Sequence, residues 1–370
     1  MFVLGASALF KRIWVVPQEY YPVPCIWDRI FLFSFLKGDF IMKNLKKIIA
    51  VALAAVLLVA FAGCSAGKPD TYKVGIIQFL PHSSLDNCTQ GVINSLKAAG
   101  IEYDVQVGSS GSPDSDCKTF AENMVSGGQY NMIIAVATPA ATAAYSAVAT
   151  ASADIPVVFC AVSDPVAAGL VKSMEAPGNN CTGTRDAFDI EGQVNLIKSL
   201  QPDIESLGVI YTTSEANSIS QLKTLKEVCD KAGIEVVSQG ITDASELNSA
   251  SVSIVSKVDA VTNFTDNNVV DNMSVLLEQA NAAGIPVYGS EIEQVKKGCA
   301  GSASLDYVKL GEQTGDIALK VKENNNNASD IPALTVTESF EVLNKGVLGR
   351  LRIAIPDSLK DVQTIDDIVD

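Results

Sequence analysis

A short signal that recurs three times along the chain constrains its fold more than any other feature. Lys97-Ala98-Ala99-Gly100-Ile101, Lys231-Ala232-Gly233-Ile234 and Ala282-Ala283-Gly284-Ile285 each follow a helical stretch and precede an apolar, β-branched run. A glycine at this point is typical of a left-handed residue that ends a helix and leads into a strand. Repeated units of helix, glycine and strand predict a chain in which β and α elements alternate.

The predicted strands are short apolar runs rather than alternations of apolar and polar residues. This pattern is expected when helices cover both faces of a parallel sheet. We therefore predict an α/β fold class with two Rossmann-like lobes, parallel sheets and a multi-strand hinge. The runs are Val74–Phe79, Met132–Val136, Val157–Cys160, Leu207–Tyr211, Ala260–Phe264 and Val287–Gly289.

The sequence also indicates two halves of similar topology. Ile155-Pro156-Val157-Val158 in the first half matches Ile285-Pro286-Val287-Tyr288 in the second, and each is followed by a serine and an acid. A helix over residues 307–323 is expected to return the chain to the first lobe, and the last strands to the second, which makes three crossings. The predicted divisions are residues 68–182 and 306–330 for lobe 1, residues 183–305 and 331–350 for lobe 2, and a C-terminal extension over residues 351–370.

Residues 1–63 are predicted to contain a targeting signal rather than to be part of the fold. Three lysines between residues 43 and 47 precede an uncharged apolar run over residues 48–62. That run of about 15 residues is shorter than the roughly 20 that span a bilayer, and the layout is that of a secretory signal. Phe61-Ala62-Gly63-Cys64 is similar to a bacterial lipobox. We expect Cys64 to be the lipidated mature N-terminus, held at the extracytoplasmic face of the cell membrane.

The remaining features of this segment leave two points open. Met42-Lys43-Asn44 is a natural start for a signal, so residues 1–41 are interpreted as an over-extension of the reading frame. An ordinary signal peptide or an uncleaved anchor is the alternative to a lipoprotein signal.

Charge and cysteine usage exclude several classes of protein. The formal net charge of −15 at pH 7 repels a phosphate backbone, so no nucleic-acid partner is expected. The cysteines form no CxxC pair and the chain has a single histidine, so we predict no metal site and no cofactor. Disulfides and buried thiols both remain open for the cysteines of the predicted lobes, which are Cys88, Cys117, Cys160, Cys181, Cys229 and Cys299.

The candidate ligand-binding residues lie in loops that follow the predicted strands. In open α/β sheets ligands bind beyond the carboxyl ends of the strands, so two lobes that face each other would line one cleft with these loops. The first half supplies Gln78, Phe79, His82, Thr138, Pro139, Ala140, Ser163 and Asp164. The second half supplies Ser214, Glu215, Ala216, Asn217, Ser218, Thr265, Asp266, Asn267, Ser290 and Glu291.

A helix start in the first half is suited to an anion. Thr138 as N-cap and Pro139 in the first turn leave backbone N–H groups and a positive dipole end to receive a ligand carboxylate. Ser214, Asn217 and Ser218 start another helix and would hold the same carboxylate from the opposite lobe. The alternative for all five residues is that they only cap helices.

Other loop residues are assigned to the rest of a small zwitterion. Asp266 follows a buried strand and is the predicted partner of an α-ammonium, with a plain capping role as the alternative. Phe79 and His82 offer apolar and stacking surface for a side chain, although a phenylalanine at a strand end is commonly part of the core. Asp164 precedes a proline and is expected to hold its own turn.

Six pieces of sequence carry a resemblance to a known family. In order, they are YKVGIIQFLPHSSLD, IIAVATPAATAA, IPVVFCAVSDPVAAGLV, SEANS, TDNNV and LDYVKLGEQTG. Together they resemble the lipoprotein substrate-binding components of ABC importers of the tryptophan/tyrosine type, from about Tyr72 to about Leu343. The resemblance implies a type I periplasmic-binding-protein fold, an aromatic amino acid as favoured ligand and an ABC permease as membrane partner. The sequence departs from the family at Pro81, where an acid is common, and at Ser214, where glycine is frequent.

The motifs of enzymes are missing from the sequence. It contains no Gly-x-Ser-x-Gly elbow, HExxH, phosphate loop or GxGxxG, so we predict a binding protein rather than a hydrolytic or other enzyme. A receptor for a sugar or another small solute is the nearest alternative. It is disfavoured because Trp14 and Trp27, the only tryptophans, lie in the predicted leader. A receptor that signals without a permease has the same sequence signature, and nothing marks an oligomer interface, so a monomer is expected.

Overall fold

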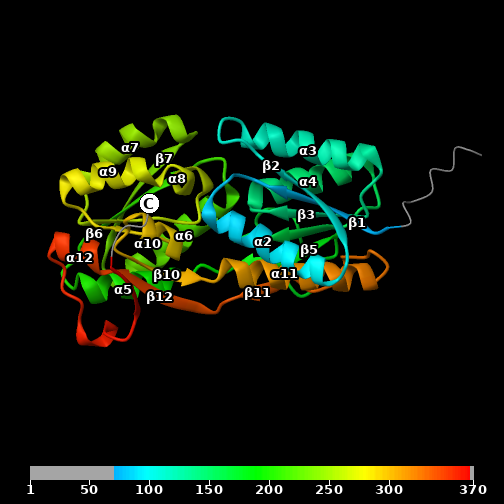
Figure 1. Ribbon diagram of the computed structural model, residues 1–370. Coiled ribbons are helices and arrows are strands. Elements are labelled where there is room, and N and C mark those ends of the chain that lie inside the picture. The colour runs from blue at the N-terminus through cyan, green and yellow to red at the C-terminus, as the bar shows by residue number, and fades with distance from the viewer. Residues whose placement is uncertain (1–70, 367–370) are drawn as a thin grey trace, which may run out of the picture. The chain divides into compact units, whose positions relative to one another are not determined.

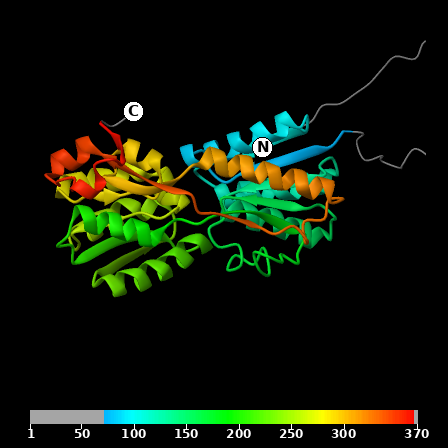
Figure 2. The same ribbon diagram turned by 90° about the horizontal axis from the view of Figure 1, so that it is seen from below.

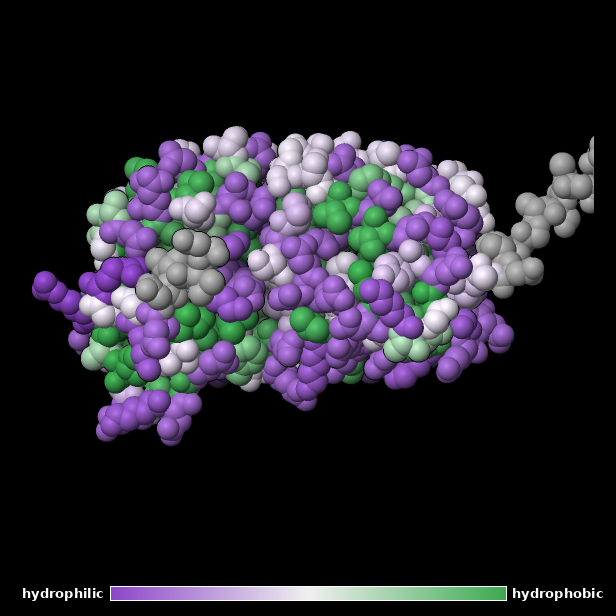
Figure 3. All heavy atoms as spheres, in the orientation of Figure 1, coloured by the Kyte–Doolittle hydropathy of each residue, from purple (hydrophilic) through white to green (hydrophobic). Residues whose placement is uncertain are grey.

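The computed structural model describes residues 71–366, which form two lobes that each contain parallel strands and covering helices (Figure 1). We define lobe 1 as residues 71–186 and 306–336, and lobe 2 as residues 187–305 and 337–366. Cys64 and the rest of the predicted leader lie outside the described residues. Within residues 71–366, no helix is both long and apolar enough to cross a membrane. The face in Figure 3 shows apolar side chains interspersed with hydrophilic ones.

Lobe 1 is built on a six-stranded sheet in which every paired strand is parallel. The strand order is β11-β5-β4-β3-β1-β2. The central strands are buried along their whole length because helices cover both faces, as the apolar runs predicted. The strands are β1 (Lys73–Gln78), β2 (Glu102–Val107), β3 (Met132–Val136), β4 (Val157–Cys160), β5 (Cys181–Asp186) and β11 (Leu334–Val336).

Two helix pairs cover this sheet, one on each face (Figures 1 and 2). On one face α3 (Pro113–Gly127) packs beside α4 (Thr138–Ala151), and on the other α2 (Ser83–Ala98) packs beside α11 (Tyr307–Glu323). The second pair is closely spaced because a Cβ on Gly311 would lie only 2.1 Å from the carbonyl oxygen of Cys88. Glycine thus brings α11 against α2, although α11 comes from far along the chain.

Lobe 2 contains a four-stranded parallel sheet and a smaller mixed sheet. The first has the order β7-β6-β8-β9 and the second the order β10-β12-β13, with β10 and β12 antiparallel. The backbone N–H of Ala300 donates to the carbonyl of Val287 (2.7 Å) and so joins the two sheets. The strands are β6 (Ser206–Thr212), β7 (Glu235–Ile241), β8 (Ala260–Thr262), β9 (Val287–Tyr288), β10 (Gly301–Leu305), β12 (Ser339–Asn344) and β13 (Gln363–Ile365).

The helices of lobe 2 are mostly connections between its parallel strands. They are α5 (Ile190–Leu200), α6 (Ala216–Ala232), α7 (Leu247–Val255), α8 (Asn267–Asp271), α9 (Met273–Ala283), α10 (Ile292–Lys297) and α12 (Lys345–Leu351), with short 3-10 turns at Ala244–Glu246 and Asp357–Leu359.

The glycines that open the sequence analysis occupy the predicted conformation. Gly233 and Gly284 are the C-caps of α6 and α9 with φ of 74° and 71°. Gly100, directly after the C-cap of α2, has φ of 66°. All three have left-handed backbone conformations and lead toward the next strand. This confirms the prediction that each glycine ends a helix before a strand.

The strand pairing corrects three predicted boundaries between the lobes. Residues 183–186 belong to β5 of lobe 1, not to lobe 2. β11 pairs with β5 through Val336 and Asp186, so residues 334–336 also belong to lobe 1. Residues 363–365 form β13 beside β12, so part of the predicted C-terminal extension lies in the second lobe's sheet. Neither β5 nor β13 has an apolar run, which is why the sequence pattern missed them.

In the part of the chain that the structure describes, the six cysteines from Cys88 to Cys299 are buried and form no disulfide. They contribute to the cores as small apolar side chains. Of the two alternatives that the sequence left open, the structure therefore shows buried thiols.

Candidate functional site

The loops at the carboxyl ends of the strands enclose a cavity between the two lobes, which we call the inter-lobe cavity. Eight of the candidate residues line it: His82, Thr138, Ser163, Asn217, Thr265, Asn267, Ser290 and Glu291. Eight further residues complete the lining: Ser84, Leu85, Ala137, Ala161, Asp186, Val270, Gln294 and Tyr307. Residues far apart in the sequence are therefore brought together where parallel α/β sheets bind ligands.

Side chains of the two lobes are hydrogen bonded across this cavity and beside it. Within residues 71–366 the pairs are Ser220 Oγ donating to Asp164 Oδ2 (2.6 Å), Ser163 Oγ with Thr265 Oγ1 (3.2 Å), and His82 Nε2 with Asn267 Oδ1 (3.4 Å). The lobes are thus in direct contact on the rim of the cavity, as expected for a closed arrangement.

Several polar atoms in the cavity have no hydrogen-bond partner among residues 71–366. His82 Nδ1, Ser84 Oγ, Thr138 Oγ1 and Asn217 Oδ1 are all buried, unpartnered and on the lining. A buried polar group left without a partner costs about 1–3 kcal/mol, so a cluster of four such groups is unfavourable in an empty site. A polar molecule with both donors and acceptors would relieve this cost.

The cavity also contains two carboxyl groups, one from each lobe. Asp186 ends β5 in lobe 1, and Glu291 precedes α10 in lobe 2. Burial raises the pKa of Asp186 to about 6 and the pKa of Glu291 to about 7. Neither carboxylate forms a salt bridge within residues 71–366.

The histidine of the cavity is neutral at physiological pH. Burial lowers the pKa of His82 to about 4, and the positive charge of Lys297 acts in the same direction. The hydrogen bond to Asn267 acts in the opposite direction but is weaker than burial. A neutral imidazole has one donor and one acceptor, so His82 contributes hydrogen bonding and ring surface rather than charge.

Two alanines at the edge of the cavity have strained backbones. Ala137 after β3 has φ of 81°, and Ala161 after β4 has φ of 55°. Left-handed backbone is uncommon for residues other than glycine, and such strain gathers at binding sites. Both residues line the inter-lobe cavity, which in this closed arrangement has a free volume of about 20 Å³.

The start of α4 differs from the sequence prediction by one residue. Ala137 is the N-cap, and Thr138 is already the first helical residue, followed by Pro139. No side chain caps this helix, and the Thr138 hydroxyl is unpartnered. Thr138 thus places the start of α4 on the cavity lining, and no side chain among residues 71–366 caps it, which suits an anion.

Asp266 lies elsewhere than the sequence analysis predicted, because it does not line the inter-lobe cavity. It is fully buried inside lobe 2, where it accepts hydrogen bonds from Thr212 N (2.6 Å), Thr212 Oγ1 (2.8 Å), Ser218 Oγ (2.7 Å) and Val269 N (3.1 Å). These bonds join β6, α6 and α8. Asp266 is an internal support of the site, and the capping alternative describes it correctly.

Glu215 is a second buried carboxyl in the same support. It accepts hydrogen bonds from Asn217 Nδ2 (3.0 Å) and from Asn267 Nδ2 (2.7 Å), and both asparagines line the cavity. Burial, together with the negative charge of Asp266, raises the pKa of Glu215 to about 8. Glu215 thus orients two lining residues without lining the cavity itself.

The other candidate residues outside the cavity have evident structural roles. Gln78 donates to Leu80 O and Asp86 Oδ1 within lobe 1. Phe79 and Ala140 belong to the hydrophobic core, so the core alternative for Phe79 is correct. Asp164 caps its own turn through Ala167 N, as predicted for it.

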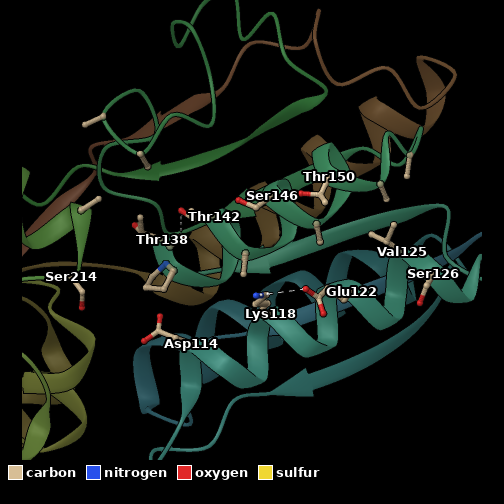
Figure 4. A pocket seen from close by; sticks show the side chains of 18 residues that line it. Asp114, Lys118, Glu122, Val125, Ser126, Thr138, Thr142, Ser146, Thr150 and Ser214 are labelled. Carbon is tan, nitrogen blue, oxygen red and sulfur yellow. Dashed lines mark hydrogen bonds and ion pairs between the residues drawn. The ribbon is translucent and has the colours of Figure 1, made fainter.

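A second, larger depression lies mainly on lobe 1 and reaches Ser214 and Ala216 of lobe 2 (Figure 4). This groove of about 870 Å³ runs between α3 and α4 and is lined by alanines, by small polar residues and by the charged side chains of Asp114, Lys118 and Glu122. The candidate residues Pro139, Ser214 and Ala216 lie here, and Thr138 borders both spaces. The inter-lobe cavity is the better ligand site, because the unpartnered polar atoms and the unpaired carboxylates gather there.

Comparisons with known proteins agree with this geometry. Residues 73–364 match the model of a family described as ABC transporter substrate binding protein. A "Tyrosine-binding protein" of Clostridioides difficile (strain R20291) is 37% identical over 330 residues, which cover 84% of this chain and 93% of that protein.

Two solved structures are similar over 80% of this chain and 100% of theirs. The ABC domain in complex with L-Trp from Streptococcus pneumoniae has a TM-score of 0.75 at 31% identity. The ligand-free, open structure of a substrate binding protein with adhesive properties from Clostridium difficile has a TM-score of 0.60 at 34% identity. The TM-score is higher for the complex than for the open structure. This agrees with a closed arrangement, in which side chains of the two lobes are hydrogen bonded to each other. These likenesses confirm the predicted α/β fold of the type I periplasmic-binding-protein class.

Proposed function

This chain belongs to the family of ABC transporter substrate binding proteins, and we propose that it captures an aromatic amino acid in the inter-lobe cavity for an ABC importer. Membership of a family of binding proteins agrees with the prediction against an enzyme. The observation that carries the proposal is the cluster of unpartnered polar atoms in a cavity closed by both lobes.

The carboxylate of the ligand is assigned to the first turn of α4. The free backbone N–H groups there and the hydroxyl of Thr138 are donors without acceptors, and the positive end of the helix dipole favours negative charge. Asn217 faces the same space from lobe 2, and its Nδ2 already donates to Glu215 and to the Thr265 carbonyl. Its free Oδ1 therefore suits a donor on the ligand.

The side chain of the ligand is assigned to the apolar part of the lining. Leu85 and Val270 supply aliphatic surface from opposite lobes, and the ring of His82 lies beside them on the lining. Ala137 and Ala161 line the same cavity with small side chains. The closed cavity has only about 20 Å³ of free volume, so the lobes must move apart to admit an aromatic ring. The lining then suits such a ring, because it combines apolar surface with a few convergent polar groups.

An amino acid is favoured over a sugar by the relatives and by the site. One relative is described as tyrosine-binding and one similar structure holds L-Trp. A helix N-terminus and two unpaired carboxylates also suit a ligand with both charges better than a neutral sugar.

Thermal denaturation of the purified protein with each of the twenty amino acids and with common sugars tests this function. We expect tyrosine or tryptophan to raise the melting temperature by about 5 °C at a concentration 100-fold above Kd, because a ligand that binds only the folded state stabilises it by about 2.7 kcal/mol. Glucose and arabinose serve as controls. A shift with a sugar and none with any aromatic amino acid would overturn the proposal in favour of a sugar receptor.

The lipid anchor and the extracytoplasmic location are a separate part of the proposal, supported by the sequence around Cys64 and by the family. We expect Cys64→Ser to move the protein from the membrane fraction to the soluble fraction, because the acylated thiol is lost. Cell fractionation followed by immunoblotting measures this, with Ser65→Ala, directly beside Cys64, as the control that keeps the thiol and leaves the distribution unchanged. Retention of the Cys64→Ser variant in the membrane would point to an uncleaved anchor.

A further inference from the structure

Asp186 and Glu291 are the least compensated charges in the inter-lobe cavity. Both are about 2% exposed, and they come from opposite lobes. Each raises the pKa of the fully buried Tyr307, where burial itself is the larger cause. The two carboxylates and the phenol of Tyr307 therefore occupy one region of the lining.

The hydrogen bonds of these two carboxylates do not supply a positively charged partner. Asp186 Oδ1 accepts from the hydroxyl of Ser163 (3.0 Å). The phenol of Tyr307 also lowers the pKa of Asp186. Glu291 accepts from backbone N–H groups at the start of α10, those of Glu293 (2.8 Å) and Gln294 (3.1 Å), and the nearby hydroxyl of Ser84 lowers its pKa. All of these donors are neutral.

The nearest cations are engaged elsewhere or lie outside salt-bridge distance. Arg185 directs its Nε to the carbonyl of Ser163 (2.7 Å). Lys297, at the end of α10, lowers the pKa of Glu291, but that effect is the smallest of its causes. Within residues 71–366 no side-chain cation lies within 4.0 Å of either carboxylate. Burying two carboxylates without a counter-ion is costly, so the site is suited to a cation from outside.

We propose that Asp186 and Glu291 together hold the ammonium group of the ligand, one carboxylate from each lobe. This assignment rests on the proposed function and replaces Asp266, which is satisfied inside lobe 2. A primary ammonium has three donors, so it can bond to both carboxylates at once. Because the two acceptors meet only when the lobes are together, the ammonium stabilises the closed arrangement.

Calorimetric titration with paired ligands tests this assignment. The probes are L-tyrosine and L-tryptophan, each compared with its desamino analogue, the corresponding 3-arylpropanoate. We expect the protein to bind the amino acid about 100-fold more tightly than the analogue. Asp186→Asn and Glu291→Gln should each weaken amino-acid binding roughly 30-fold, because a buried charge pair loses one partner.

The desamino analogues distinguish lost charge pairing from lost structure. They carry only a negative charge, so removal of either carboxylate should leave their affinity unchanged or raise it. Asp164→Asn is the matched control, because it makes the same chemical change at a lobe contact outside the cavity. It should leave the ratio between amino acid and analogue unaltered. The melting temperature of each variant verifies folding.

Two further outcomes separate this inference from the function it rests on. If the unmodified protein binds neither amino acid, the proposed function fails and the pairing fails with it. If it prefers the amino acid over the analogue but both variants keep that preference in full, the function stands and the assignment to Asp186 and Glu291 is wrong.

Discussion

Replacing Asp266 by alanine is expected to lower the free energy of unfolding by about 4 kcal/mol, the largest stability effect we expect of a single substitution in this protein. The change leaves four donors on Thr212, Ser218 and Val269 without an acceptor. These donors hold β6, α6 and α8 together beneath the cavity. Relief of the repulsion between Asp266 and Glu215 offsets only part of this loss.

Urea denaturation followed by circular dichroism measures the change, and two variants define its cause. Asp266→Asn keeps one acceptor oxygen and should cost less than half as much. Asp164→Ala removes a partly exposed cap and should cost about 1 kcal/mol or less. Equal losses for Asp266→Ala and Asp164→Ala would mean that the buried hydrogen bonds of Asp266 do not support the lobe.

The affinity for the amino acid is expected to rise about 100-fold between pH 5 and pH 8. In the free protein the pKa of Glu291 is about 7 and that of Asp186 about 6, so both carboxyls are largely protonated at pH 5. An ammonium pairs with the ionised form and lowers both pKa values on binding. Protons are therefore released on binding, and affinity increases with pH up to tenfold per unit for each group until the pKa of the free site is passed.

Glu215, whose pKa is about 8, ionises mainly above pH 7 and contacts the lining residues Asn217 and Asn267. The other titratable groups near the two carboxyls keep their charge states between pH 5 and pH 8. The pKa of His82 is about 4, and burial raises the pKa values of Tyr307, Cys88 and Cys299, so these groups stay neutral. The positive charges of Arg185 and Lys297 lower the pKa values of Asp186 and Glu291 respectively, and Glu293 raises the pKa of Glu291.

Calorimetry at pH 5, 6, 7 and 8 in buffers of different ionisation enthalpy measures both the affinity and the protons released. The desamino analogue should show the opposite trend, because its carboxylate is repelled as the cavity becomes negative. The double variant Asp186→Asn with Glu291→Gln should bind the amino acid with a flat pH profile between pH 5 and pH 7, below the pKa of Glu215. A flat profile in the unmodified protein, or affinity that falls with pH, would contradict the assignment.

The sequence predicts the layers of this fold because the signals for them are local. Gly100, Gly233 and Gly284 need only their own backbone conformation to end a helix. Runs such as Met132–Val136 are apolar throughout because both faces are covered, whatever helices cover them. Helix α11 occurs at the predicted residues for the same reason. By contrast, β5 reads Cys-Thr-Gly-Thr-Arg-Asp, and its place in the sheet depends on β4 and β11 beside it.

The candidate site was predictable as a set of loops but not as a set of contacts. Strand ends identified the loops that contain Thr138, Asn217 and Glu291, because parallel strands end at one edge of a sheet. Tyr307 and Asp186 were missed, since each lies where the chain crosses between the lobes. A search for polar residues at those crossings would have found both.

The sequence by itself determined the α/β layering, the helix ends and the edge of the sheets at which a ligand binds. Only the tertiary structure decided which carboxylates face that ligand. Asp266 and Glu291 both follow a strand and both cap a helix, so they look alike in sequence. Asp266 is surrounded by donors of its own lobe, whereas Glu291 faces the opposite lobe. The direction of a side chain at a strand end depends on which partners pack around it, and those partners are distant in sequence.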